Sequence, residues 1–404
     1  MSLSKIINKK TLTILGLNSG TSADGLDMAI LKFYHTEKGI KIKFIVGSKK
    51  SYNNELRKSV LEFALSEKVK LDEVVYLDNV LGKFYGKQAN AFLKKSAKEN
   101  IKVDAVASHG QTVRHLPHRI SWLKQKVHGS LQLGSADFIA AMTGKVVVSD
   151  FRQADIALGN EGAPITTGAM AALFASPVQS RLIVNIGGIA NFFYFPDRKS
   201  PLPVLASDCG PGNSLCDLLS QKLFNCQFDK NGHYALKGKI SSRLLSLLLA
   251  EPFFSKNKMS TGREEFGVDV VNKMIAFSER FHLSKYDLMA TAGELTAFTI
   301  VSKIKTIINK DKRLSKLYLT GGGRNNIFFR NRIKYYLPVM DVAMADELGV
   351  KADYIEAAAY AVLGEACLHS KSLIHSVVND RKKKYPVLGK ITQPPLSMKK
   401  KTLL

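Results

Sequence analysis

Apolar positions in the first part of the chain fall into short runs, separated by stretches with helical spacing. The apolar runs predict buried strands at residues 11–18, 26–34, 40–46, 103–108 and 145–149. Apolar residues three and four positions apart predict helices at residues 54–65, 71–98 and 138–143. The first two strands flank a polar turn, as in a β-hairpin, and the alternation of strands and helices that follows predicts an α/β layer fold.

The same pattern starts again in the second part of the chain. Strands are predicted at residues 181–187, 192–195, 204–207 and 317–320. Helices are predicted at residues 214–224, 241–249, 268–281, 292–305 and 355–369. Each half therefore opens with an apolar strand, a glycine-bearing turn and a returning strand. This favours duplicated α/β domains that face each other across a cleft, although two unrelated hairpins would give the same pattern.

This repeat sets the expected domain boundaries. We expect residues 1–178 to form an N-terminal α/β domain, and residues 179–370 to form a C-terminal α/β domain closed by the helix at residues 355–369. Residues 371–404 are rich in proline and lysine and predict a basic, partly ordered tail. A length of 404 residues is sufficient for two hydrophobic cores.

Composition narrows the class of protein. Hydrophobic residues make up 45% of the chain, and no apolar run approaches the ~18 residues that span a bilayer, so no membrane association is expected. The first ten residues lack the apolar core of a signal peptide, which predicts a cytoplasmic location. Four scattered cysteines, none in a C-x-x-C pair, argue against a disulfide framework and a structural zinc site.

The net charge of +25 raises the alternative of an anionic partner such as nucleic acid. The excess is mostly lysine, spread along the chain and densest at residues 381–384 and 399–401, without interleaved aromatic residues. A solvated basic surface with no specific nucleic-acid binding is the preferred interpretation. A nucleic-acid-binding protein, whose affinity would fall steeply with salt, stays as the alternative.

Three glycine-bearing turns carry the candidate chemistry. The first combines backbone N–H groups, hydroxyls and one carboxylate between two strands, in the order Ser19, Gly20, Thr21, Ser22, Ala23, Asp24 and Gly25. Such a turn can bind the phosphates of a nucleotide, with Asp24 beside a hydrated Mg²⁺ ion, although it is not a P-loop. A plain polar hairpin loop is the alternative.

The second turn, residues 208–213 (DCGPGN), follows a predicted strand and precedes a predicted helix. A carboxylate such as Asp208 at a strand end can act as a general base, and the helix N-terminus favours negative charge. A helix cap is the alternative role for Asp208. The third turn, residues 321–323 (GGG), allows the backbone to approach a flat ligand such as adenine, or forms an ordinary loop.

Two polar clusters follow strands in the first half. They offer hydrogen-bond donors and acceptors of the kind that bind sugar hydroxyls, from His109, Gln111, Thr112 and Arg152. His115 and His118 have no acidic or cysteine ligand at a suitable spacing, so no metal site is predicted there.

As a set, these blocks resemble the anhydro-N-acetylmuramic acid kinase family. Residues 16–27 (GLNSGTSADGLD) resemble the family's opening G-x-x-SGTS-x-DG-x-D. Further blocks follow in family order at residues 108–112 (SHGQT), 150–152 (DFR), 162–164 (GAP), 185–188 (NIGG), 208–213 (DCGPGN), 260–264 (STGRE) and 321–323 (GGG). Each block alone is weak, but the set is specific because it covers most of the chain.

The resemblance implies a duplicated actin-like, hexokinase-type (ribonuclease H-like) fold and a homodimeric kinase that uses ATP and Mg²⁺. Members of the family open the 1,6-anhydro ring of N-acetylmuramic acid with water while they phosphorylate O6, which gives the 6-phosphate and ADP. The bacterial members recycle cell-wall sugar. By the same resemblance, Asp208 is the general base that deprotonates the attacking water.

The remaining site residues are assigned to two groups. The nucleotide would be bound by Ser19, Gly20, Thr21, Ser22, Ala23, Asp24, Gly25, Leu26, Gly187, Gly210, Gly212, Asn213, Gly321, Gly322 and Gly323. The sugar would be bound by His109, Gln111, Thr112, Arg152 and Glu161. No metal-ligating residue is predicted.

Two departures from the family pattern bear on the sugar. Glu161 stands where the family has glutamine, and Asn18 replaces the methionine that is common before S-G-T-S. Asn18 and residues 385–390 (YPVLGK) resemble levoglucosan kinase, a relative that acts on 1,6-anhydroglucose. Residues 110–117 (GQTVRHLP) and 131–134 (LQLG) resemble the muramic-acid enzymes. The muramic sugar is the predicted substrate, with levoglucosan as the alternative sugar. A non-catalytic regulator that binds sugar or nucleotide is the alternative from another class.

Overall fold

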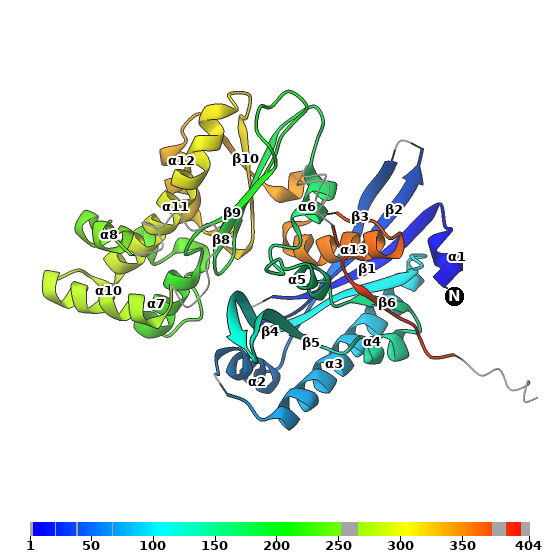
Figure 1. Ribbon diagram of the computed structural model, residues 1–404. Helices are drawn as coiled ribbons and strands as arrows, with labels where there is room; N and C mark the ends of the chain where they lie inside the picture. Colours follow the sequence, from blue (N-terminus) through cyan, green and yellow to red (C-terminus); the bar gives the residue numbers. More distant parts are fainter. Residues whose placement is uncertain are drawn as a thin grey trace, which may run out of the picture. The chain divides into compact units, whose positions relative to one another are not determined.

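Two mixed β-sheets organise the computed structural model of the chain (Figure 1). The structure describes residues 3–20, 22–37, 39–66, 68–251, 266–373 and 385–396. Contacts divide the chain into a first unit, residues 1–173 with 349–404, and a second unit, residues 174–348. Within those described ranges, no helix is long and apolar enough to cross a membrane.

The sheet of the first unit has the strand order β12-β6-β4-β1-β2-β3, with β5 paired to β4. Its strands are β1 (Thr11–Ser19), β2 (Gly25–Thr36), β3 (Gly39–Ser51), β4 (Ala105–Trp122), β5 (Gln125–Leu133), β6 (Val146–Ser149) and β12 (Lys390–Thr392). The strands β1, β2 and β3 form an antiparallel meander, whereas β4 runs parallel to β1 and β6 runs parallel to β4.

Helices cover both faces of this sheet. They are α1 (Leu3–Ile7), α2 (Asn54–Leu65), α3 (Leu71–Lys98), α4 (Ala136–Thr143), α5 (Gln153–Ala157), α6 (Thr167–Phe174) and α13 (Ile355–Leu368). Side chains of β1 alternate between the faces, so Leu15 and Leu17 share a core with α3 and α4, while Gly16 faces α13. A Cβ at Gly16 would lie 1.9 Å from the Ala357 carbonyl oxygen, so glycine is what allows α13 to pack this closely on the sheet.

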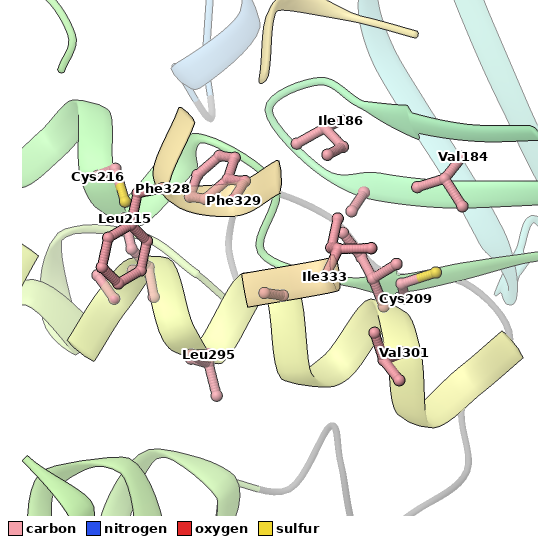
Figure 2. Close-up of a cluster of buried hydrophobic side chains, with 14 of the residues drawn as sticks. Val184, Ile186, Cys209, Leu215, Cys216, Leu295, Val301, Phe328, Phe329 and Ile333 are labelled. Atoms are coloured by element: carbon pink, nitrogen blue, oxygen red, sulfur yellow. The ribbon is translucent and has the colours of Figure 1, made fainter. Parts of the chain in front are cut away.

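The sheet of the second unit has the strand order β11-β10-β7-β8-β9. Its strands are β7 (Arg181–Ile186), β8 (Ala190–Phe195), β9 (Leu205–Gly210), β10 (Lys316–Thr320) and β11 (Asp341–Met344). Its helices are α7 (Ser214–Phe224), α8 (Ser242–Leu249), α10 (Val268–Phe281), α11 (Lys285–Lys310) and α12 (Ile327–Tyr336). Figure 2 shows its core, in which Val184 of β7 and Cys209 of β9 share a buried cluster with Leu295 and Val301 of α11.

The two units are built in the same way. In each, three strands form an antiparallel meander, the next strand joins the first strand in parallel, and a further parallel strand follows. The order is β3-β2-β1-β4-β6 in the first sheet and β9-β8-β7-β10-β11 in the second, which is 3-2-1-4-5 when these strands are numbered along each unit. This is the order of ribonuclease H-like domains, and its occurrence in both units confirms the predicted duplication of α/β domains. The predicted cleft between the domains stays a prediction.

Two expectations about domain organisation are wrong. The helix predicted at residues 355–369 belongs to the first unit, because Gly364 packs against Ala107 of β4, just as Ala357 packs against Gly16 of β1. The units part between Leu173 and Phe174 and not after residue 178. In the tail, β12 pairs with β6 at the edge of the first sheet. The basic runs at residues 381–384 and 399–401 lie outside the described residues.

Several strands and helices extend beyond their predicted limits. The strand predicted at residues 103–108 continues as β4 to Trp122, so the polar cluster at residues 109–112 lies inside a strand and not after its end. The strand predicted at residues 204–207 continues through Asp208 to Gly210. The helix predicted at residues 292–305 is the middle of α11. The sequence did not predict β5, β11, β12, α1, α5, α6 or α12.

Candidate active site

The second unit brings two of its glycine turns together. The Asn213 backbone N–H donates to the Gly187 carbonyl at 2.7 Å. The Asn213 side-chain nitrogen Nδ2 donates to the carbonyls of Ile186 and Gly187 at 3.1 and 3.0 Å. A Cβ at Gly212 would lie 2.1 Å from the Gly187 carbonyl oxygen, so this contact requires glycine. The turn after β7 and the turn after β9 are therefore locked to each other.

The turn after β10 joins the same place. Gly321 has a φ of +77°, and a Cβ there would lie 2.6 Å from the Ile186 carbonyl oxygen. A Cβ at Gly323 would lie 2.3 Å from the Ile186 side chain. At Gly322, the heavy atom nearest to an added Cβ is Asn213 Nδ2 at 3.9 Å, so the chain has room beside it here. The structure thus brings together the predicted nucleotide residues Gly187, Gly212, Asn213, Gly321, Gly322 and Gly323.

Helix α7 begins directly after these turns. The Asn213 side chain makes no capping hydrogen bond to α7, because it donates to carbonyls instead. The buried Thr296 hydroxyl of α11 fixes the start of the helix by donating to the Pro211 carbonyl and, at 2.8 Å, to the Gly212 carbonyl. A helix N-terminus without a side-chain cap, next to glycine turns, is a favourable place for an anion such as a phosphate group.

Asp208 lies within β9, where its backbone is opposite Asn191 of β8. The residue is half-buried, and it is not the cap of α7, because that position belongs to Asn213. Burial and then the charge of Asp208 raise the pKa of the neighbouring Cys209 thiol. Cys209 therefore stays protonated and is a poor nucleophile.

In the first unit, a buried hydrogen-bond network supports the turn between β1 and β2. Ser19 Oγ donates to Gln111 Oε1 at 2.6 Å, and the Tyr52 hydroxyl donates to Ser19 Oγ at 2.9 Å. Gln111 Nε2 donates to the Gly20 carbonyl at 3.2 Å. Ser19 is 2% exposed and Gln111 is 1% exposed. Both side chains therefore fix the turn from the interior. A bound ligand would contact the backbone of these residues, or residues beside them, and not these two side chains.

The rest of this turn presents mainly backbone. Ala23 and Leu26 are fully buried, so they have no side chain to offer a phosphate group. Gly25 is enclosed as well, because a Cβ there would lie 2.2 Å from a carbonyl oxygen of β3. Asp24 is exposed, and its carboxylate lies 3.4 Å from the Arg57 guanidinium. Of the remaining predicted residues, Gly20 and Ser22 are half-buried, and Thr21 lies outside the described residues.

Two carboxylates lie where β1 and β2 approach this turn. Asn18 and Asp27 are opposite each other in the two strands, and Asn18 Nδ2 donates to Glu356 Oε2 of α13 at 2.7 Å. Asp27 Oδ1 is buried and accepts no hydrogen bond, although Lys49 Nζ lies 3.6 Å away. Burial raises the pKa of Asp27 to about 6, Lys49 opposes that rise, and the charge of Glu356 adds to it. Burial is thus the larger influence on the Asp27 carboxyl, and the Lys49 ammonium offsets only part of it.

His109 and Arg152 meet in the first unit, as the sugar-binding prediction requires. Arg152 Nε donates to His109 Nε2 at 3.3 Å, and Arg152 Nη1 donates to the Gly162 carbonyl at 3.3 Å. The His109 ring stacks on Tyr360 of α13, with ring centroids 4.4 Å apart. Burial, and then the Arg152 charge, lower the pKa of His109 well below its ordinary value. His109 is therefore a neutral imidazole held in one orientation.

The other two predicted sugar residues lie on neighbouring segments. Thr112 is half-buried in β4, and its hydroxyl accepts a hydrogen bond from Gln132 Nε2 at 3.2 Å. Glu161 is exposed in the loop after α5. The buried Asp155 carboxylate fixes that loop by accepting from the Gly162 backbone N–H at 3.0 Å. Since Gly162 also accepts from Arg152, the loop that carries Glu161 is tied to the His109–Arg152 pair.

Sequence reasoning missed part of this arrangement. Asp27 belongs to the opening motif, but the motif alone gives no reason to assign it a role different from that of the turn at residues 19–25. Glu356 had a weak signal, a single acidic residue in the first turn of an otherwise apolar, alanine-rich helix. The tyrosines that extend the Ser19 network, Tyr52 and Tyr85, share a hydrogen bond of 2.7 Å and had no signal. The block at residues 260–264 lies outside the described residues.

Comparison with known proteins identifies the family. The family profile of anhydro-N-acetylmuramic acid kinase matches residues 12–393. The anhydro-N-acetylmuramic acid kinase of Caldanaerobacter subterraneus subsp. tengcongensis is 32% identical over 394 residues, which cover 96% of this chain and 99% of the relative. That of Trichormus variabilis is 36% identical over 361 residues, which cover 87% and 89%.

Similarity to solved structures is more distant. The activator of the 2-hydroxyisocaproyl-CoA dehydratase from Clostridium difficile, with bound ADPNP, is 13% identical and has a TM-score of 0.42, with 89% of this chain and 96% of that chain covered. The assignment rests instead on sequence similarity over nearly the full length of the chain. On that basis, the chain belongs to the anhydro-N-acetylmuramic acid kinase family.

Proposed function

We propose that this chain is an ATP-dependent kinase that opens 1,6-anhydro-N-acetylmuramic acid with water and phosphorylates its O6. The products are N-acetylmuramic acid 6-phosphate and ADP. The observation that carries the proposal is the family match, which spans residues 12–393. The reaction would return cell-wall sugar to metabolism, and we expect it to take place in the cytoplasm.

The glycine turns of the second unit support the nucleotide part of the proposal. Phosphoryl transfer depends mainly on positioning and charge neutralisation, so the protein needs to supply backbone donors and a rigid frame more than a nucleophile. The N-terminus of α7 offers the donors, and the locked turns around Gly212 offer the frame. The room beside Gly322 suits the close approach of a flat adenine base or a ribose.

Asp208 is the proposed general base. Its carboxylate accepts a proton from water as the water oxygen bonds to C1 of the anhydro sugar. The C1–O6 bond breaks, and O6 attacks the γ-phosphorus of ATP as the bond from that phosphorus to the β,γ-bridging oxygen breaks and ADP leaves. Because O6 leaves C1 directly for phosphorus, the reaction needs no second carboxylic acid to protonate the leaving oxygen, unlike ordinary glycoside hydrolysis.

The first unit is proposed to hold the phosphates and Mg²⁺. The buried Asp27 Oδ1, which accepts no hydrogen bond, and the Glu356 carboxylate provide the oxygen donors that Mg²⁺ prefers. When bound, Mg²⁺ neutralises charge on the β- and γ-phosphates. Asn18 orients the Glu356 carboxylate, and the Ser19 network holds the backbone of residues 20–26 in place. The sequence-based assignment of a magnesium carboxylate to Asp24 is less favoured, since Asp24 is exposed and paired with Arg57.

The sugar is proposed to bind beside the His109–Arg152 pair. Arg152 can bind a carboxylate such as the lactyl group of the muramic sugar, because a guanidinium offers several N–H donors in one plane. The neutral His109 beside it adds no charge that would compete for the carboxylate. Glu161 and Thr112 lie on segments connected to this pair and are proposed to contact the remaining polar groups of the sugar.

A coupled ADP-release assay tests the proposed function directly. The purified chain is given ATP and Mg²⁺ with 1,6-anhydro-N-acetylmuramic acid, levoglucosan or glucose. We expect ADP release with the muramic sugar, one ADP for each sugar 6-phosphate formed, and no release above background with glucose. Binding of sugar and ATP without ADP release would instead support the alternative of a non-catalytic regulator.

Levoglucosan stays as the alternative sugar because both segments that resemble levoglucosan kinase are connected to the site. Asn18 is bonded to Glu356, and Lys390 Nζ of β12 lies 2.5 Å from the Asp150 carboxylate, two residues before Arg152. A higher kcat/KM for levoglucosan than for the muramic sugar would decide in its favour. We also propose a homodimer, which sedimentation of the full chain tests by its mass.

A further inference from the structure

Away from the residues discussed so far, three metal-ligating side chains converge in the first unit. His35 lies near the end of β2, Glu365 lies in the last turns of α13, and His369 follows directly after that helix. Glu365 and His369 are four positions apart and so share one face of the helix. Their side chains are 4% and 14% exposed, and that of His35 is 21% exposed. The cluster is therefore nearly enclosed.

The geometry of this cluster is that of a metal-ligand set. Glu365 Oε1 lies 3.0 Å from His35 Nε2 and 2.9 Å from His369 Nδ1. All three atoms lie within 4.8 Å of one another. Ligands about 2.0–2.1 Å from one Zn²⁺ ion at near-tetrahedral angles lie roughly 3.0–3.5 Å from each other. The carboxylate oxygen therefore already lies from each histidine nitrogen at about the spacing that two ligands of one ion have.

The second nitrogen of each ring is already occupied by a backbone carbonyl. His35 Nδ1 lies 3.0 Å from the Lys9 carbonyl oxygen, and His369 Nε2 lies 3.1 Å from the Ile7 carbonyl oxygen. A carbonyl can only accept, so His35 Nδ1 carries an N–H, and in a neutral ring the lone pair of His35 Nε2 then points toward Glu365. His369 has a carbonyl beside each nitrogen, because its Nδ1 lies 3.1 Å from the Glu365 backbone carbonyl oxygen as well as 2.9 Å from the Glu365 carboxylate. His369 Nδ1 can therefore bind an ion when Nε2 keeps that ring's N–H. A histidine that donates its outer N–H to a carbonyl while its inner nitrogen faces an ion is the usual arrangement around bound metals.

The carbonyls are held firmly enough to orient the rings. The His35 backbone N–H donates to the Lys10 carbonyl at 2.9 Å, and Lys9 Nζ lies 2.5 Å from the Asp104 carboxylate. Ile6 of α1 is 1% exposed, which anchors the start of the segment in the core. The N-terminal segment, the end of β2 and the end of α13 therefore meet at a place where two imidazole nitrogens and a carboxylate face one another.

We propose that His35, Glu365 and His369 bind one Zn²⁺ ion. Two imidazole nitrogens and one carboxylate oxygen suit zinc better than Mg²⁺, which prefers oxygen ligands alone. The site is separate from the proposed magnesium site, because His35 and Asp27 are eight residues apart along β2, about 26 Å at the rise of a strand. Water would complete the coordination. The ion would join the end of β2, near one end of the chain, to the end of α13, near the other, which points to a structural role.

Metal titration of the full chain tests this site. The protein is treated with a chelator, dialysed, and titrated with ZnCl₂ by calorimetry, and with CoCl₂ by visible absorption. We expect one Zn²⁺ per chain with submicromolar affinity and a rise in melting temperature of several degrees. Bound Co²⁺ should give visible bands without the near-ultraviolet thiolate charge-transfer band, since the cluster contains no cysteine.

Matched variants separate this site from surface binding. His369→Gln and His35→Gln should each weaken Zn²⁺ binding at least 100-fold and remove the thermal shift. His233→Gln, which removes an exposed histidine from the second unit, should change neither. If the wild-type chain binds Zn²⁺ no more tightly than His369→Gln, the cluster is a hydrogen-bonded group of protonated histidines around Glu365 and the proposal is wrong. A variant that fails to fold leaves the Co²⁺ spectrum of the wild-type chain as the deciding measurement.

Discussion

Gly212 and Gly322 make a matched pair for testing the glycine turns of the second unit. A Cβ at Gly212 would lie 2.1 Å from the Gly187 carbonyl oxygen, more than 1 Å inside the ~3.3 Å of an ordinary carbon–oxygen contact. That oxygen accepts two hydrogen bonds from Asn213, so it cannot retreat without loosening them. At Gly322, an added Cβ meets nothing closer than 3.9 Å.

The cost of Gly212→Ala follows from these contacts. Overpacking costs about 1–3 kcal/mol, and weakening the two hydrogen bonds adds about 0.5–1.5 kcal/mol each. The lower entropy of unfolded alanine returns about 0.4–1 kcal/mol. We therefore expect Gly212→Ala to destabilise the second unit by about 2–4 kcal/mol. For a unit of this size, that corresponds to a fall in melting temperature of roughly 5–15 °C.

The assay combines calorimetric unfolding with ATP kinetics on the same preparations. Gly322→Ala should melt within about 1 °C of the wild-type chain, since a tolerated surface change costs under ~0.5 kcal/mol. It should nevertheless raise the KM for ATP about tenfold or more, because its methyl group would occupy room proposed for the nucleotide. A Gly212→Ala variant as stable as the wild-type chain would refute the steric reasoning. An unchanged KM in Gly322→Ala would refute the placement of the nucleotide.

Three further predictions concern single side chains. Asp208→Asn should lower kcat by at least the 10²–10⁴-fold that a general base contributes, while the affinity for ATP stays within a few-fold of the wild-type value. Near-normal turnover of this variant would show that Asp208 is not the general base. Asp27→Asn should raise the Mg²⁺ concentration needed for half-maximal activity. It should not lower the melting temperature, because burial already disfavours the charged carboxylate. An unchanged Mg²⁺ requirement would contradict Asp27 as a ligand. His109 has a folded-state pKa below its unfolded value near 6.5, so protons bind preferentially to the unfolded chain and stability falls as the pH drops below 6.5. His109→Gln should therefore lose less stability than the wild-type chain between pH 6.5 and 5, by up to about 1.4 kcal/mol per pH unit. If the melting temperatures of variant and wild-type chain instead fell in parallel with pH, this role of His109 would be contradicted.

Local pattern was sufficient to predict most of the elements. The bounds of α2, α3, α7 and α10 match the predicted helices to the residue, because apolar spacing and turn residues act within one segment. The repeated strand–turn–strand opening predicted the duplication, which is confirmed by the strand order that the two sheets share apart from β5 and β12.

Long-range packing was the part that local pattern could not supply. Apart from Glu356 and Glu365, helix α13 is mostly apolar on all sides, so its sequence indicates burial but not which sheet it covers. Its partner sheet is selected by Gly16 and Gly364, whose missing side chains allow close packing with Ala357 and Ala107, and such a match is visible only in three dimensions.

The same reason explains what was missed at the site. Family blocks marked Asp208 and the glycine turns, because these lie in continuous motifs. Asp27 and Glu356 come from opposite ends of the chain and are connected through Asn18. Burial of Ser19 and Gln111 in one network likewise depends on Tyr52, which no motif includes. Residues that position others were thus harder to predict than residues that act on a ligand.

In the proposed reaction, water opens the sugar ring while the sugar's own O6 takes the phosphoryl group. The reaction with 1,6-anhydro-N-acetylmuramic acid and ATP in ¹⁸O-labelled water, followed by mass spectrometry of the early product, tests this most directly. We expect a sugar 6-phosphate with ¹⁸O at C1 and none in the phosphate group. Inorganic phosphate labelled with ¹⁸O, released while the anhydro sugar stays intact, would contradict it.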